Sequence, residues 1–367
     1  MRHDGMELGS VLREVYGTPD PPGAQARKLA GDASTRIYYR LTVPSPRTGP
    51  ASAIVMRLPE DALGSDEGPG TEQAPELPFL NVHRLLTARG APVPAVLARD
   101  LDAGVLLLED LGDETLERRL HDAPEDWDGL YAQAVDVLAE LHERCEPGEA
   151  GSLAHARRFD RALLRWELDH FREWGLEAVH GPPSASDRAE LDGLLDEVAD
   201  AVAALPCGFV HRDYQSRNLM WRTDGRLAVI DFQDALVGPR AYDLAALLCD
   251  SYVPLGLPLQ RAMVARYAAR RGIAAPDLEG EVWRVAVQRK LKDAGRFVFI
   301  DRVRGNPRFL PWYGPSLGYV RRALNQLKSL DIGGPWEPLA ALLARNLPGF
   351  EGTVAPPASI GSKSEKS

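Results

Sequence analysis

The chain has 367 residues, of which 44% are hydrophobic and 26% charged, a composition typical of a soluble globular protein with one large domain or two lobes. Its 43 Lys+Arg against 53 Asp+Glu give a formal net charge of −10, which argues against nucleic acid or an anionic membrane as the main partner. No segment has the length and apolarity of a membrane span or of a secretion signal, and the three cysteines have neither metal-ligand nor disulfide spacing. We therefore expect a cytoplasmic protein.

The first third of the chain predicts strands. Residues 26–30 and 37–43 are expected to form two of them, joined by a tight turn that contains Ser34 and Thr35. Such a turn is either an ordinary hairpin turn or a place where backbone N–H groups bind the phosphates of a nucleotide. The next strand, 53–58, carries a single cation, Arg57.

A Gly/Asp/Pro-rich loop over 61–70 precedes a helix predicted over 77–89. Residues 105–109 are apolar enough to be a buried strand. The backbone of Glu109 to Leu111, directly after it, is suited to bind the edge of an adenine ring where two lobes join.

From residue 113 onward the pattern is helical, with helices predicted over 128–142, 161–174, 189–205 and 282–304. The last of these carries Arg289, Lys292 and Arg296 on one face, which is either a solvated basic stripe or a site for an anionic substrate group. Residues 307–313 supply aromatic rings for the core or for stacking on a sugar. Residues 351–367 are predicted to be disordered.

The stretch 208–234 carries the chemistry. It contains His211, Arg212 and Asp213 followed at the fifth position by Asn218, which is the H-R-D-x-x-x-x-N spacing of a kinase catalytic loop. Two short apolar runs then flank an Asp-Gly pair, which predicts a hairpin that returns Asp231 to the side of Asn218.

Phosphoryl transfer requires mainly positioning and neutralisation of phosphate charge. We assign Asp213 as the acceptor of the hydroxyl proton, and Asn218 and Asp231 as ligands of Mg²⁺, since Asp231-Phe232-Gln233 stands where kinases have Asp-Phe-Gly. Turn formation without chemistry is the alternative for all three. Asp243, which begins a later helix, either caps that helix or reaches back to fix His211 and the loop, and we favour the second role.

Several segments together resemble the aminoglycoside phosphotransferase superfamily, and within it the anomeric N-acetylmuramate/N-acetylglucosamine kinases of bacterial cell-wall recycling. The similarity covers most of the chain except its first twenty and last seventeen residues. The segments are FVHRDYQSRNLMW, IDFQDALVGPRAYDLAALLCDSY, GDASTRIYYRL, LLLEDLG, LLRWELDHFREW and QRKLKDAGRFV.

This resemblance implies an α+β, two-lobed protein-kinase-like fold with a small β-sheet N-lobe over 1–110 and a larger, mostly helical C-lobe over 111–350. It implies ATP and Mg²⁺ as cofactors, a small-molecule sugar as substrate and a monomer. The nucleotide would be bound by Ser34, Thr35, Arg57, Glu109 and Leu111, the catalytic loop would be supported by His211 and Asp243, and the substrate would meet Arg289, Lys292 and Arg296.

Two features depart from kinases. Arg57 stands where they have Lys, and the helix that should offer its partner carboxylate presents Phe79, Asn81 and His83. A nucleotide-binding pseudokinase is therefore the alternative from another class. Aminoglycosides, choline and homoserine are alternative acceptors, and Glu167 and Asp169 are acidic residues available to a cationic one. A protein kinase is disfavoured, because no Ala-Pro-Glu segment lies between Asp231 and Asp243.

Overall fold

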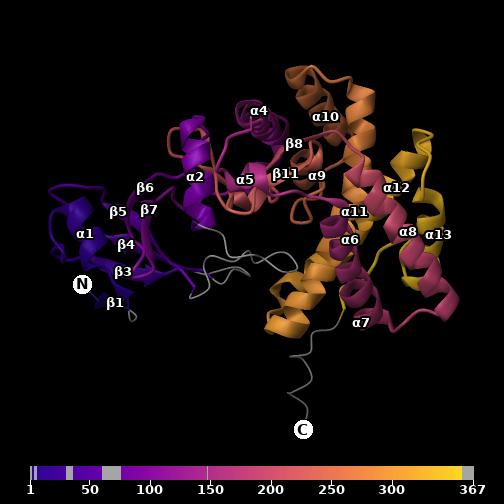
Figure 1. Ribbon diagram of the computed structural model, residues 1–367, viewed down its shortest axis with the longest axis horizontal. Coiled ribbons are helices and arrows are strands. Elements are labelled where there is room, and N and C mark those ends of the chain that lie inside the picture. Colours follow the sequence, from indigo (N-terminus) through magenta and orange to yellow (C-terminus); the bar gives the residue numbers. More distant parts are fainter. Residues whose placement is uncertain (1, 4–5, 30–35, 60–75, 147, 358–367) are drawn as a thin grey trace, which may run out of the picture. The chain divides into compact units, whose positions relative to one another are not determined.

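The computed structural model describes residues 2–3, 6–29, 36–59, 76–146 and 148–357, which fall into two compact units (Figure 1). The first unit comprises Met1–Glu114 and Met220–Ile230, and the second comprises Thr115–Leu219 and Asp231–Ser367. The segment 220–230 therefore belongs with the N-terminal unit, although it follows the catalytic loop in the sequence. The predicted turn with Ser34 and Thr35, the loop 61–70 and most of the predicted tail lie outside the described residues.

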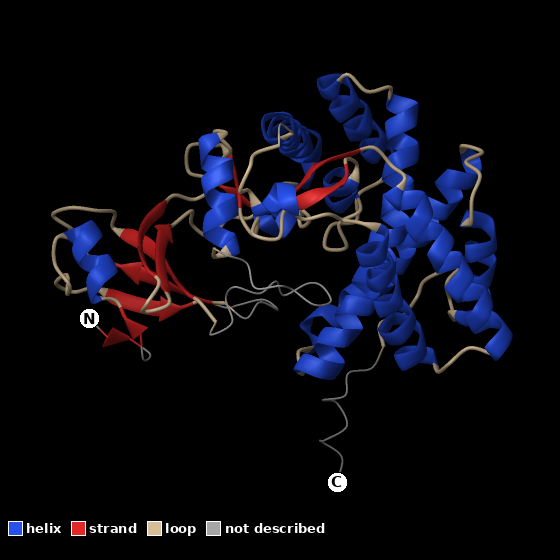
Figure 2. Ribbon diagram, in the orientation of Figure 1, coloured by secondary structure: helices blue, strands red, loops and turns tan. Residues whose placement is uncertain are grey.

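The first unit is built on an antiparallel five-stranded sheet with the order β3-β4-β5-β7-β6 (Figure 2). The strands predicted over 37–43, 53–58 and 105–109 are confirmed within a residue or two, and a separate short pair lies near the N-terminus. The bounds are β1 (Arg2–His3), β2 (Met6–Glu7), β3 (Gln25–Lys28), β4 (Ile37–Thr42), β5 (Ser52–Arg57), β6 (Val96–Asp100) and β7 (Val105–Glu109).

Alternation of side chains along the strands explains the core of this unit. Every second residue of β4, β5 and β7 packs with Val11 and Leu12 of helix α1 (Gly9–Tyr16). Strand β7 lies between two neighbours, and all four residues from Val105 to Leu108 are buried, which accounts for its unbroken apolar run. The helix predicted over 77–89 is α2 (Pro78–Ala88).

The predicted hairpin is confirmed as β9 (Leu219–Trp221) paired with β10 (Leu227–Val229). Its turn is closed by the Arg222 N–H, which donates to the Arg226 carbonyl at 2.8 Å. Gly225 has a φ of 79°, the left-handed region that glycine enters without steric cost. Asn218 directly precedes β9 and Asp231 follows β10, so both residues lie at the end of the hairpin away from its turn.

The second unit is helical. Each helix predicted in this region is confirmed, and 161–174 is found to change from an α-helix into a π-helix, η2 (Phe171–Glu177). The helices are α3 (Leu116–Asp122), α4 (Trp127–Cys145), α5 (Leu153–Ala156), α6 (Arg161–His170), α7 (Ala178–His180), α8 (Ala185–Ala203), α9 (Tyr242–Leu248), α10 (Leu257–Arg271), α11 (Ala275–Arg304), α12 (Tyr313–Ser329) and α13 (Trp336–Asn346), with 3₁₀ turns η1 (Pro124–Asp126), η3 (Ser216–Asn218) and η4 (Pro307–Trp312).

Helix α11 is the centre of the helical unit. It has 30 residues and contacts α6, α8, α9, α10, α12 and the π-helix. The end of α6, where the π-helix begins, approaches it closely at Gly295: an added Cβ would lie 2.5 Å from the carbonyl oxygen of His170. Glycine is therefore required at this crossing. Because α11 is covered on several sides, three of its cations, Arg289, Lys290 and Lys292, are buried.

A two-stranded sheet frames the catalytic loop. Strand β8 (Cys207–Val210) pairs antiparallel with β11 (Leu236–Pro239), and Val210 lies opposite Leu236. The loop begins directly after β8, and the segment that starts at Asp231 ends at β11. This pairing brings two segments of the predicted motif together.

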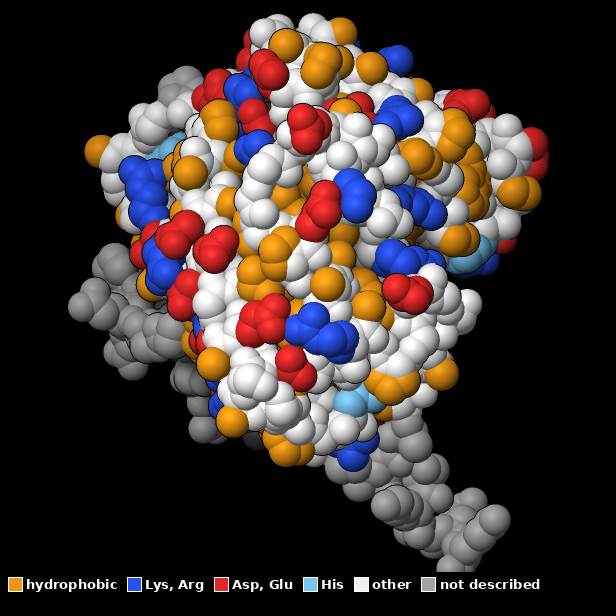
Figure 3. All heavy atoms as spheres, turned by 90° about the vertical axis from the view of Figure 1, so that its right-hand side faces the viewer, with side chains coloured by type: hydrophobic (Ala, Val, Ile, Leu, Met, Phe, Trp, Pro, Cys, Tyr) orange, Lys and Arg blue, Asp and Glu red, His pale blue; other side chains and the backbone are white. Residues whose placement is uncertain are grey.

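Acidic and basic side chains are interspersed with apolar ones on the face turned to the viewer in Figure 3. Exposed ion pairs on the helical unit include Arg345 with Glu190 at 2.8 Å and Arg261 with Glu279 at 2.9 Å. Such exposed pairs contribute little stability each. In the part of the chain that the structure describes, no helix combines the length and apolarity that crossing a membrane requires.

Candidate active site

The backbone of the motif is strained at two non-glycine residues. Arg212 has a φ of 81° and Asp231 a φ of 65°, both in the left-handed region. A residue in this region costs on the order of 1–3 kcal/mol and persists only where its surroundings hold it, and such residues concentrate at functional sites. No composition or spacing argument indicates this strain.

Asp243 supports the start of the loop from α9. Its Oδ2 accepts from the His211 N–H at 2.6 Å and its Oδ1 from the Arg212 N–H at 2.9 Å. The side chain does not cap α9, so the capping alternative is wrong. Burial acts to raise the pKa of Asp243, but the hydrogen bond from His142 and the nearby His211 outweigh it, so the pKa lies below its usual value.

Arg289 on α11 also contacts the loop. It is 2% exposed, and its Nη1 donates to the Arg212 carbonyl at 2.7 Å while its Nη2 donates to Asp213 Oδ1 at 3.1 Å. Its guanidinium lies 5.0 Å from the centre of the Tyr242 ring. Burial acts against its charge, but nearby Tyr242, Asp293 and Asp213 raise its pKa well above the usual range. The solvated-stripe interpretation is therefore wrong for Arg289.

A second buried carboxylate, Asp250, supports the end of the loop. Its Oδ2 accepts from the backbone N–H of Ser216 at 2.9 Å and from the Ser216 hydroxyl at 2.6 Å. Burial raises the pKa of Asp250, opposed by those hydrogen bonds and by the charge of Lys290. Lys290 itself donates to Ser251 and, at 2.7 Å, to Asp293.

The two acidic residues left open for a cationic acceptor already have cationic partners. Glu167 accepts from Arg212 Nη2 at 3.0 Å and is 1% exposed. Asp169 lies 2.5 Å from Arg165 and 2.8 Å from Arg172. Their charges are compensated inside the helical unit, so they do not supply an acidic cage.

Asn218 and Asp231 offer hard oxygen donors of the kind that Mg²⁺ prefers. The Asn218 Nδ2 donates to the Asp213 carbonyl at 2.9 Å, which directs the amide oxygen away from the loop backbone. Gln233 donates to Asp231 Oδ1 at 2.9 Å and thereby orients that carboxylate. Among the described residues no three His, Cys, Asp or Glu gather into a metal cage. The donor set fits Mg²⁺ held by few protein ligands together with phosphates.

Arg217, within the loop, was not identified from the sequence. It makes a two-pronged ion pair with Glu117 at 2.9 and 3.0 Å, and its guanidinium stacks 3.5 Å above the Tyr252 ring. Trp312 lies near the same guanidinium, at 5.8 Å. Contacts between residues so far apart in the chain leave no local sequence signal.

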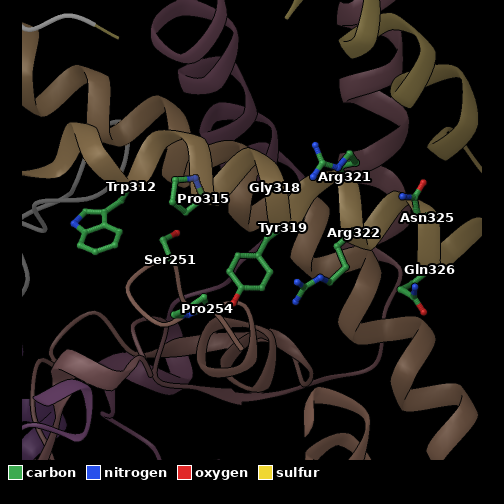
Figure 4. Close-up of a pocket in the computed structure, with 10 residues that line it drawn as sticks. All are labelled: Ser251, Pro254, Trp312, Pro315, Gly318, Tyr319, Arg321, Arg322, Asn325 and Gln326. Carbon is green, nitrogen blue, oxygen red and sulfur yellow. The ribbon is translucent and has the colours of Figure 1, made fainter. Parts of the chain in front are cut away.

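Trp312 also lines one end of a pocket of about 590 Å³ in the helical unit (Figure 4). Arg321 and Arg322 line its other end, and both guanidinium groups donate to backbone carbonyls. Arg322 donates to the Leu255 carbonyl at 2.6 Å and lies 5.1 Å from the centre of the Tyr319 ring.

The residues assigned to the nucleotide lie in the first unit. Arg57 is exposed at the end of β5 and makes no ion pair with a described residue. The Glu109 N–H already donates to the Ala95 carbonyl at 2.8 Å, and the Glu109 carboxylate pairs with Arg222. An adenine edge would therefore have to use the Glu109 carbonyl or Leu111.

The remaining cations on α11 differ in their surroundings. Lys292 is 8% exposed and lies 3.8 Å from Asp293, so it is buried beside that carboxylate. Arg296 is half-buried, 5.4 Å from the centre of the Phe299 ring. Two half-buried rings contact Phe299, His170 at 5.0 Å and Trp174 at 5.3 Å, and the half-buried Trp166 contacts His170 at 5.1 Å.

Solved structures share this fold. The chain is similar to a choline/ethanolamine kinase family protein from Mesorhizobium loti, with a TM-score of 0.56 and 19% identity over 92% of this chain and 98% of that one. It is also similar to the ADP-bound aminoglycoside phosphotransferase APH(2'')-Ib, with a TM-score of 0.53 and 14% identity over 84% and 95% of the two chains. The predicted kinase-like fold is confirmed.

Sequence relatives are more similar. The chain is 35% identical to an N-acetylmuramate/N-acetylglucosamine kinase of Pseudomonas aeruginosa over 83% of this chain and 86% of that one. A kinase of the same name from Neisseria meningitidis is 31% identical, over 92% and 94% of the two chains. Residues 25–281 match the model of the phosphotransferase enzyme family. The chain therefore belongs to the phosphotransferase enzyme family.

Proposed function

We propose that this chain is an ATP-dependent kinase that phosphorylates the anomeric hydroxyl of N-acetylmuramate or N-acetylglucosamine. The observation that carries the proposal is the catalytic loop, in which Arg289 holds Asp213 through one carboxylate oxygen and Asn218 donates to the Asp213 carbonyl, while Gln233 orients the carboxylate of Asp231. The printed names of the relatives supply the sugar. A cytoplasmic monomer belongs to the same proposal.

Asp213 acts as the proton acceptor in this proposal. Arg289 engages Oδ1, and the side chain remains 19% exposed, so the second oxygen is available to the hydroxyl of the sugar. In phosphoryl transfer the nucleophile needs orientation more than a strong base, because the transition state is loose. A carboxylate fixed in this way accepts the proton as the oxygen–phosphorus bond forms.

Asn218 and Asp231 would hold Mg²⁺, which neutralises phosphate charge when bound with ATP. Arg57 and the backbone near Ser34 and Thr35 would bind the phosphates. The Glu109 carbonyl and Leu111 would bind the adenine edge. A nucleotide-binding pseudokinase is disfavoured, because it would have no need for a loop whose strained Arg212 is held by buried charges.

The surroundings of the loop favour an anionic or neutral sugar over a cationic acceptor. Glu167 and Asp169 are neutralised by arginines, so choline or an aminoglycoside finds no open acid there. Arg296 lies on the same face of α11 as Arg289, seven residues and therefore about 10 Å farther along the helix. We propose that Arg296 binds the carboxylate by which N-acetylmuramate differs from N-acetylglucosamine. The rings around Phe299 would pack against the apolar face of the sugar.

The test is the ratio of kcat/KM for the two sugars in wild type and in Arg296→Met. A charge-assisted hydrogen bond contributes about 1.5–3 kcal/mol, so the substitution should remove a preference for N-acetylmuramate of roughly tenfold to hundredfold. The rate with N-acetylglucosamine should stay unchanged. Lys292→Met is the matched comparison on the same face, and an unchanged ratio in both variants would rule out this face as the carboxylate site.

A further inference from the structure

We infer that Arg289 is a positioning residue for the catalytic base. The inference rests on the proposed function, because it takes Asp213 as the proton acceptor. Two donors of one guanidinium reach two consecutive residues of the loop, the Arg212 carbonyl at 2.7 Å and Asp213 Oδ1 at 3.1 Å. One side chain thus fixes both the backbone before the base and the carboxylate of the base.

The backbone contact acts where the loop is strained. Arg212 has a φ of 81°, and its two flanking peptide groups are held from two different helices. Asp243 on α9 accepts from its N–H, and Arg289 on α11 donates to its carbonyl. A left-handed residue persists only when its surroundings hold it, and these two charged contacts supply that constraint.

Arg289 is itself immobilised. Its guanidinium lies over the Tyr242 ring, and Asp293, one turn along α11, contributes a compensating negative charge. With 2% of its surface exposed, it has no face left for a substrate. Any influence on the reaction must pass through Asp213, which distinguishes Arg289 from the half-buried Arg296 on the same side of the helix.

The residue type matters for this role. A guanidinium presents parallel donors in a rigid fork, so it can bind a carbonyl and a carboxylate at once, whereas a lysine ammonium is a single point charge. Holding Oδ1 leaves the other carboxylate oxygen to meet the sugar hydroxyl in one orientation.

The experiment compares Arg289→Ala with a matched control, Arg322→Ala. Both arginines donate to a backbone carbonyl and lie over a tyrosine ring, but Arg322 contacts no residue of the loop. We expect kcat to fall by about 10²-fold in Arg289→Ala, because loss of alignment at the reacting atoms has an effect of that size. The KM for ATP and for sugar should change little, and millimolar guanidinium chloride should restore part of kcat. Arg322→Ala should keep its kcat and should not respond to guanidinium.

Arg289→Lys covers the case in which the alanine variant does not fold. It keeps the charge but lacks the fork, so its kcat should lie between the alanine variant and wild type while its melting temperature stays near wild type. A wild-type kcat in either Arg289 variant would overturn the inference. So would a loss of kcat in Arg322→Ala as large as that in Arg289→Ala. Failure of the proposed function would look different, since wild type would then leave N-acetylmuramate and N-acetylglucosamine unphosphorylated.

Discussion

The catalytic loop and the β9–β10 hairpin that follows it are held in place by different forces. The turn of the hairpin is specified locally, by the two short apolar strands that it joins and by Gly225, which adopts a left-handed φ of 79°. The loop is specified from a distance, by Asp243 on α9 and Arg289 on α11. Removing one member of a buried ionic contact leaves its partner uncompensated. Substitutions in the loop and its supports should therefore cost far more than substitutions in the hairpin turn.

The largest expected effect on the loop is that of Asp213→Asn. The variant keeps the size of the side chain and its contact with Arg289 but lacks the proton acceptor, so kcat should fall by roughly 10²-fold or more. Affinity for MgATP should remain near wild type. Steady-state kinetics and calorimetry test the two statements, and near-normal turnover would show that Asp213 is not the base.

Asp231→Ala should abolish the dependence of ATP binding on Mg²⁺, because it removes the charged ligand of the proposed site and leaves the neutral Asn218. Asn218→Ala should have a smaller effect. Calorimetry with and without a chelator measures this directly. Chelation should weaken ATP binding to wild type and leave the Asp231 variant unaffected, and a variant that still responds to Mg²⁺ would place the metal on other residues.

The two buried aspartates that support the loop should respond oppositely to pH. The pKa of Asp243 is lowered in the folded protein, so its ionisation stabilises the fold above the unfolded pKa, and this contribution is lost as pH falls through the folded pKa. The pKa of Asp250 is raised, so its ionisation costs stability as pH rises above its unfolded value.

Asp243→Asn should therefore destabilise the protein more at neutral pH than in acid, on the order of 3–5 kcal/mol at neutral pH, because His142 loses its buried partner. Asp250→Asn should show the reverse trend, with the smaller loss at neutral pH. Urea denaturation of wild type and both variants across the acidic range provides the comparison. Parallel pH profiles for the two variants would contradict it.

The smallest effect is expected in the hairpin. Gly225→Ala meets no heavy atom within 4 Å, so its cost is only that of a left-handed alanine, about 1 kcal/mol. Stability measured by urea denaturation should fall by that amount, and kcat should remain unchanged. A loss of activity as large as that of a loop substitution would show that the turn and the loop are not held independently.

The same difference explains what the sequence can predict. The strands, the hairpin and the helices follow from apolar periodicity and turn residues, and the motif spacing identifies Asp213, Asn218 and Asp231. Spacing places Arg289 on one face of a helix but does not tell which element that face meets. Its partner Asp213 lies 76 residues earlier in the chain, and Glu167 lies 45 residues from its partner Arg212. Only the folded chain reveals such pairings, and with them the strain at Arg212.

The most direct test of the account is phosphorus NMR of the products formed by wild type and by Asp213→Asn from MgATP and N-acetylmuramate. We predict that wild type converts ATP into ADP and a sugar phosphate whose resonance shows coupling to the anomeric proton, and that Asp213→Asn forms this product at least about 10²-fold more slowly. Wild type that leaves N-acetylmuramate and N-acetylglucosamine unphosphorylated, or a variant that forms the product at the wild-type rate, would contradict the account.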